Sequence, residues 1–136
     1  MKKLLFVVDP LDQFKVYKDT TFSIMREAQW RGYLIAACLP QDIQWKSGGF
    51  VMATVQQISL TGSQPGWYRV HNTMRMALKD FDAVLMRKDP PFNAEYIYAT
   101  HLLEQAERED GNVVNRPRAL RDHPEKLAIM EFPELV

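Results

Sequence analysis

Cysteine, net charge and long apolar runs are all scarce in this chain, and each scarcity excludes a class of protein. Among its 136 residues Cys38 is the single cysteine, so no internal disulfide framework can form, and we expect a cytoplasmic protein. The 17 basic and 17 acidic residues cancel, which argues against nucleic acid or an anionic membrane as the main partner. The longest apolar stretches, residues 4–8 and 34–39, are far too short to span a membrane.

Several chemical signatures are also missing. No GxGxxG follows the first predicted strand and no GxxxxGK[ST] is present, which excludes a dinucleotide fingerprint and a P-loop. His71, His101 and His123 lie far apart and have no metal-ligand neighbours at helical or finger spacing. Cys38 lies in the apolar run LIAACL, which is typical of an inert core residue. We therefore predict no metal site and no catalytic residue in this chain.

What remains is an alternation of strands and helices. Residues 3–8 predict a buried first strand, and residues 21–31 carry one apolar helical face. Gly32 is placed to end that helix, and residues 33–39 predict a second strand. This succession indicates an α/β fold with a mainly parallel sheet. The chain is long enough for one domain with a substantial core.

The middle of the chain predicts a small antiparallel insertion or sheet edge. Its signal is a Ser-Gly-Gly turn at 47–49 between two extended stretches, which is typical of a hairpin. The predicted pieces are strands at 43–46 and 50–54, further extended pieces at 55–60 and 67–70, and a weak helix at 72–78.

A crowded charged corner is the best site candidate. Residues 83–86 predict a short buried strand, and Arg87, Lys88 and Asp89 follow at its end. In open α/β sheets, ligands bind beyond the carboxyl ends of the strands. Two prolines at 90–91 should stiffen this corner. The structural alternative is that Arg87 and Asp89 pair with each other or cap the next helix, and the residues alone leave both interpretations open.

The last third of the chain predicts two helices and a strand. Asn93 is placed to cap the first helix, and residues 112–115 predict the strand. Asp122 and Glu125 form a capping-box pattern before a second helix, whose apolar residues between 127 and 132 lie close to the last residue. Both a domain excised from a longer protein and a terminal helix docked on its own core would end this way, and the residues alone leave the two interpretations open.

Four segments carry a family resemblance. They are KDTTF at 18–22, EAQWRGY at 27–33, LMRKDPPFNAEYIYAT at 85–100 and VVNRPRALRDHPEKL at 113–127. In this order they resemble the amino-terminal part of prokaryotic glutathione synthase, whereas residues 41–77 are only loosely similar. The resemblance implies a Rossmann-like, three-layer pre-ATP-grasp domain. It places a substrate-binding domain at 1–120 and the truncated start of an ATP-grasp domain at 121–136.

The resemblance also implies a reaction. That reaction is ATP-dependent ligation of γ-glutamylcysteine to glycine through an acyl phosphate, with ATP and Mg²⁺ as cofactors, in a homo-oligomeric carbon–nitrogen ligase. Arg87 would clamp a carboxylate of the dipeptide and Lys88 would add a point charge, because guanidinium and ammonium groups suit anions. Asp89 would contact the substrate ammonium or orient Arg87. A second implied substrate contact consists of Lys18, Asp19 and Thr20, and Lys126 would approach ATP.

Most of the implied catalytic machinery lies outside these residues. The ATP-grasp domain would supply the phosphate-covering loop and the magnesium-binding carboxylates, so we expect the chain alone to be inactive and to bind no cofactor tightly. The competing hypothesis is a self-sufficient flavodoxin-like module, whose charged corner serves a small anion or an oligomer contact.

Overall fold

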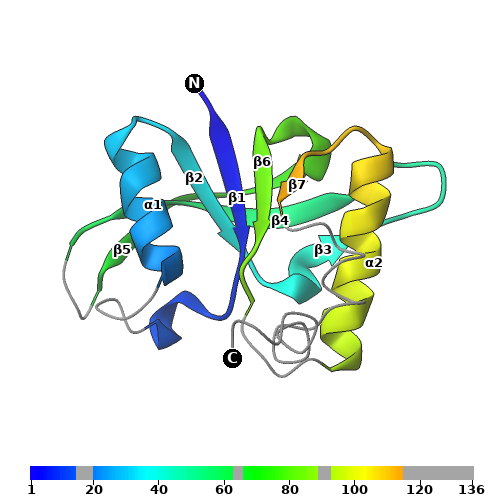
Figure 1. The fold of residues 1–136 in the computed structure, drawn as a ribbon, viewed down its shortest axis with the longest axis horizontal. Coiled ribbons are helices and arrows are strands. Elements are labelled where there is room, and N and C mark those ends of the chain that lie inside the picture. Colours follow the sequence, from blue (N-terminus) through cyan, green and yellow to red (C-terminus); the bar gives the residue numbers. More distant parts are fainter. Residues whose placement is uncertain (15–19, 63–65, 89–92, 115–136) are drawn as a thin grey trace, which may run out of the picture.

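The computed structural model is a seven-stranded mixed sheet with a helix on each face, and it describes residues 1–14, 20–62, 66–88 and 93–114 (Figure 1). The strands are β1 Lys3–Val7, β2 Leu34–Cys38, β3 Ile43–Gln44, β4 Met52–Leu60, β5 Tyr68–Ala77, β6 Ala83–Met86 and β7 Val113–Val114. The α-helices are α1 Thr20–Trp30 and α2 Ala94–Arg108, and single 3₁₀ turns lie at η1 Leu11–Gln13, η2 Pro40–Asp42 and η3 Leu78–Asp80.

Strand order and direction confirm the predicted α/β class. The order across the sheet is β3-β4-β2-β1-β6-β7, and β5 pairs along β4. The pairs β1–β2, β1–β6 and β6–β7 are parallel, whereas β4 is antiparallel to β2, β3 and β5. Within the described residues, β4 is therefore the one strand that runs against the others. The antiparallel portion lies at one end of the sheet, as the sequence predicts.

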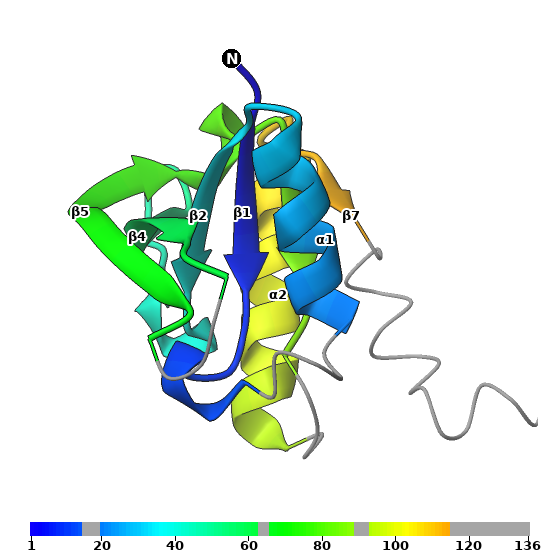
Figure 2. The same cartoon turned by 90° about the vertical axis from the view of Figure 1, so that its left-hand side faces the viewer.

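The strand β1 lies at the centre because its apolar run can be buried on both faces. Leu5 and Val7 enter the core that α2 covers, and Phe6 and Val8 enter the core that α1 covers. None of the four side chains is more than 1% exposed. Figure 2 shows the other end of the sheet, where β4 and β5 extend to the left of β1. The end of β4 still contacts α1, because Gln29 exchanges two hydrogen bonds with the backbone of Leu60.

Both helices have the predicted boundary signals. The side chain of Asn93 accepts a hydrogen bond from the backbone N–H of Tyr96 at 2.9 Å, which satisfies one of the free donors at the start of α2. Gly32 follows α1 with a φ of +80°, a left-handed conformation that glycine adopts without strain. The chain can therefore turn sharply from α1 into β2.

The antiparallel region corrects two predictions. The hairpin of β3 and β4 is confirmed, but β4 is one strand to Leu60 instead of two pieces. The predicted helix at 72–78 is wrong, because Tyr68–Ala77 forms a single strand, β5. β5 pairs with β4 along its length, apart from one register irregularity, and this satisfies the backbone groups on that side of β5. Such tertiary pairing overrides a weak local preference for helix. We call these two strands the β4–β5 ribbon.

Two predictions for the last part of the chain have different outcomes. The strand predicted at 112–115 is confirmed as β7, which pairs with β6. The predicted helix that begins at Asp122, like the proposed boundary at residue 120, lies outside the described residues. None of the helices in the described ranges combines the length and the apolar character needed to cross a membrane.

Candidate functional site

The charged corner lies where two central strands end side by side. The strands β1 and β6 are parallel neighbours, and Val7 is opposite Met86 in their register. The backbone N–H of Arg87 donates to the carbonyl of Val7 at 2.8 Å, so the ladder continues one residue past β6. Asp9 follows β1 at the same edge of the sheet. The carboxyl ends of both strands therefore present their charged residues together, as the sequence predicts for Arg87 and Lys88.

Arg87 is held by the first turn of α1. Its Nε–H donates to the hydroxyl oxygen of Thr21 at 3.1 Å. The side chain of Arg87 is half-buried, and Thr21 is 5% exposed. This contact joins residues 66 positions apart and brings the start of α1 to the end of β6. The guanidinium is therefore positioned by a helix as well as by its own strand.

Lys88 has a different partner. Its ammonium nitrogen lies 2.8 Å from a carboxylate oxygen of Asp9, and the two side chains are 21% and 24% exposed. The carboxylate offsets part of the ammonium charge, and the ion pair ties the residue pair after β6 to the segment after β1. Partly exposed ion pairs of this kind contribute about 0–1 kcal/mol to stability.

An aromatic cluster fixes the segments that flank residues 15–19. The ring of Trp67 stacks on Phe14 with centroids 5.2 Å apart and meets Phe22 edge-on at 5.4 Å. Its indole N–H donates to the carbonyl of Leu11 at 3.1 Å. Phe14 precedes residues 15–19 in the chain and Phe22 follows them closely. Trp67, at the start of the ribbon, thus secures the chain on both sides of the predicted contacts Lys18 and Asp19.

The predicted site residues divide into two groups. The structure brings Arg87 and Lys88 together at the corner, and it places Thr20, which is exposed, at the start of α1. The neighbouring Thr21, which the sequence analysis did not select, makes the contact with Arg87. Asp9 was also missed, although its place two residues after β1 is a signal of the same kind as that of Arg87. The residues outside the described ranges are Lys18, Asp19, Asp89 and Lys126.

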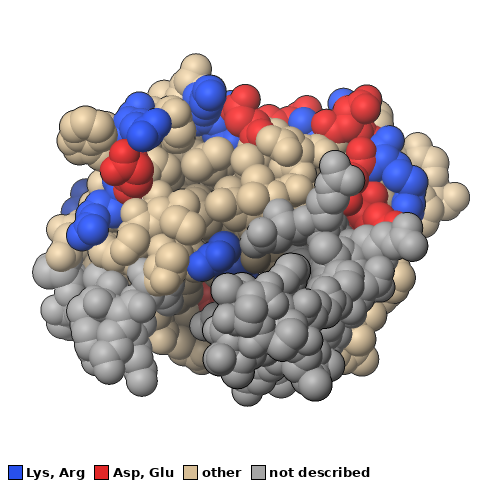
Figure 3. All heavy atoms as spheres, viewed as in Figure 1, with Lys and Arg blue, Asp and Glu red and all other residues tan. Residues whose placement is uncertain are grey.

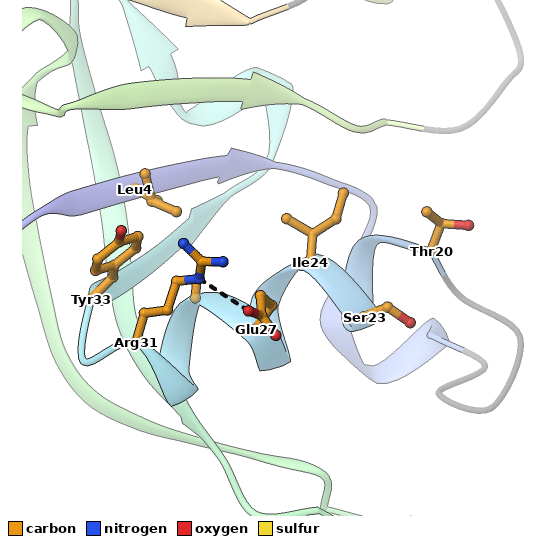
Figure 4. Close-up of a pocket in the computed structure, with 8 residues that line it drawn as sticks. Leu4, Thr20, Ser23, Ile24, Glu27, Arg31 and Tyr33 are labelled. Atoms are coloured by element: carbon orange, nitrogen blue, oxygen red, sulfur yellow. Dashed lines mark hydrogen bonds and ion pairs between the residues drawn. The ribbon is translucent and has the colours of Figure 1, made fainter.

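A shallow, mostly apolar groove of about 410 Å³ runs between α1 and β1. Figure 4 shows Thr20 at one end of it and Tyr33 at the other. Near the Tyr33 end, Arg31 Nε and Glu27 Oε1 are 3.0 Å apart, and this hydrogen bond is the main cause that raises the pKa of Arg31. The remaining lining residues are Leu4, Ser23, Ile24 and Ala28.

Other chemistry is sparse in the described residues. In these ranges no group of three or more His, Cys, Asp or Glu side chains could hold a metal ion. Burial raises the pKa of the Cys38 thiol, which lies in the core and not at a site. Figure 3 shows basic and acidic side chains intermixed along the upper rim of one face, without a broad area of one sign among its described atoms.

Comparison with known proteins identifies the family. The family model described as "Prokaryotic glutathione synthetase, N-terminal domain" matches residues 2–121. Glutathione synthetases of Ralstonia nicotianae, Nitrosomonas europaea and Vibrio cholerae are 51%, 47% and 45% identical to 97%, 96% and 99% of the chain. The chain spans only 40%, 42% and 42% of the length of these relatives. The chain therefore belongs to the family of prokaryotic glutathione synthetase N-terminal domains, as the four sequence segments predicted.

Proposed function

We propose that this chain is the dipeptide-binding part of an ATP-dependent glutathione synthetase. The observation that carries the proposal is the family match over residues 2–121. The complete enzyme ligates γ-glutamylcysteine to glycine through an acyl phosphate and works as a homo-oligomer in the cytoplasm. In it, residues 1–120 form the substrate-binding domain, and the ATP-grasp domain begins at residue 121.

Arg87 is the central substrate contact in this proposal. A guanidinium at the end of a buried strand is a suitable partner for a substrate carboxylate, because its planar donors match two carboxylate oxygens. Lys88 keeps Asp9 in place and adds positive charge near the substrate. Asp89 contacts the substrate ammonium or orients Arg87 in this proposal. A second substrate contact consists of Lys18, Asp19 and Thr20, and Lys126 contacts ATP.

The cofactors belong to the rest of the enzyme. The described residues contain no cluster that fits a magnesium ion, and the sequence has no P-loop, so we assign Mg²⁺ and most of the ATP contacts to the ATP-grasp domain. The 136-residue chain alone should release no phosphate from ATP in the presence of γ-glutamylcysteine and glycine. Phosphate release by this chain would contradict the assignment of ATP and Mg²⁺ binding to the ATP-grasp domain.

A titration followed by NMR tests the binding role. γ-Glutamylcysteine is added to the 136-residue chain and to the variant Arg87→Ala, and the dissociation constant is read from the shifts of backbone amides near the corner. Charge-assisted hydrogen bonds contribute about 1.5–3 kcal/mol, so we expect Arg87→Ala to weaken binding by about tenfold or more. The dipeptide with an amidated cysteine carboxylate tests which carboxylate is bound.

Arg75→Ala provides the matched control, because Arg75 is exposed on the β4–β5 ribbon. This variant should bind the dipeptide as the unchanged chain does. Equal weakening by both substitutions would show that arginine acts only through net charge. A chain that ignores γ-glutamylcysteine but associates tightly in sedimentation would favour the flavodoxin-like module instead.

A further inference from the structure

The contact between Thr21 and Arg87 differs from an ordinary arginine ion pair. The hydroxyl oxygen of Thr21 accepts from Nε at 3.1 Å, and Thr21 is almost fully buried. The carboxylate of Asp9, at the same corner, pairs with Lys88, and among the described residues Arg87 takes part in none of the ion pairs. A neutral acceptor therefore orients the guanidinium without cancelling its positive charge.

The position of this hydrogen bond restricts how an anion can approach. A guanidinium offers two pairs of donors to a carboxylate: the side pair of Nε and one Nη, and the end pair of both Nη groups. Because the hydroxyl of Thr21 takes Nε, the side pair of Arg87 is no longer complete. The end pair is left for a planar ligand with two oxygens.

The geometry points to Thr21 as a positioning residue that makes Arg87 an end-on fork for a carboxylate of the dipeptide. This inference rests on the proposed function and deepens it. Two attachments fix the fork, since the Arg87 backbone bonds to Val7 and its side chain bonds to α1. Arginine is well suited to such a role, because less freedom is lost for each bond that its planar group forms.

Two substitutions separate positioning from packing. Thr21→Val keeps the shape of the side chain and removes the acceptor, and Thr21→Ser keeps the acceptor and removes a methyl group. We expect Thr21→Val to raise the dissociation constant for γ-glutamylcysteine about three- to tenfold, as for the loss of one orienting hydrogen bond, and Thr21→Ser to leave it within about twofold. Binding that is unchanged in folded Thr21→Val would overturn the inference.

The NMR signal of the Arg87 Nε–H supplies a readout that needs no ligand. In the unchanged chain and in Thr21→Ser, this proton should exchange with water more slowly than that of Arg75, and Thr21→Val should abolish the difference. An Arg87 proton as exposed as that of Arg75 in the unchanged chain would also overturn the inference. If Arg87→Ala weakens binding and Thr21→Val does not, the proposed function stands and only the positioning role of Thr21 falls. If the unchanged chain does not bind the dipeptide, both fall.

Discussion

The parallel part of the sheet and the β4–β5 ribbon hold their strands in different ways. The central strand β1 has five residues, and its last three are buried, whereas the edge strand β5 has ten residues, of which only Ala77 is buried. Apolar burial on two faces stabilises β1, and backbone pairing to one neighbour stabilises most of β5. Side chains therefore define the first region, and the partner strand defines the second.

This difference explains where the candidate site lies. The corner at Arg87 follows two strands whose side chains are fixed by packing on both faces, and such strands position a ligand contact well. Trp67, the residue directly before β5, connects the ribbon to the segments around residues 15–19, because it packs on Phe14 and Phe22. A rigid centre carries the charged groups, and an exposed edge secures the chain around them.

The largest expected effect is a contrast in stability between the two regions. Phe6→Ala should lower the free energy of unfolding by about 3–5 kcal/mol, because Phe6 is fully buried under α1 and its loss leaves a cavity. Thr73→Ala, on an exposed position of β5, should change it by less than about 0.5 kcal/mol. Urea denaturation measures both, and similar losses would contradict the contrast.

A smaller effect concerns the helix that covers the parallel part. Asn93→Ala should cost about 1 kcal/mol of unfolding free energy, because the backbone N–H of Tyr96 loses its acceptor at the start of α2. Asn93→Asp keeps an acceptor oxygen and should retain most of the stability. The same denaturation experiment compares the two variants, and equal losses would mean that Asn93 does not stabilise α2 through its cap.

The smallest effect is a pH dependence at the ribbon. The hydroxyl of Tyr68 donates to Asp12 at 2.7 Å, and this hydrogen bond, followed by burial, raises the pKa of Tyr68. A raised pKa in the folded state stabilises the protein below the ordinary tyrosine pKa of about 10, and this stabilisation is lost as the pH rises through the folded-state value. Stability should therefore fall less steeply above pH of about 10 in Tyr68→Phe than in the unchanged chain.

The difference in slope between the two proteins reports the ionisation of Tyr68 alone, because lysines titrate in the same pH range in both of them. Identical pH profiles for the two would show that the bond to Asp12 does not persist in solution.

Only part of the candidate site could be predicted from the sequence. Arg87 and Lys88 follow an apolar run that predicts a strand end, so their place at the sheet edge could be inferred from neighbouring residues. Thr21 could not be inferred, because its contact with Arg87 spans 66 residues and depends on how α1 packs on the sheet. The same holds for Trp67, whose indole N–H reaches the carbonyl of Leu11 across 56 residues.

By itself, the sequence determined the elements whose own residue pattern indicates burial or backbone conformation. These are the apolar strands β1, β2 and β6, the helices α1 and α2, and the turn at Gly32. These could be predicted because burial on two faces, helical periodicity and a positive φ each demand particular residues at short range. The tertiary structure decided that residues 72–77 extend as part of β5 and that Thr21 contacts Arg87. Both depend on pairing or packing with another element of the fold, and no local pattern of residues specifies such a partner.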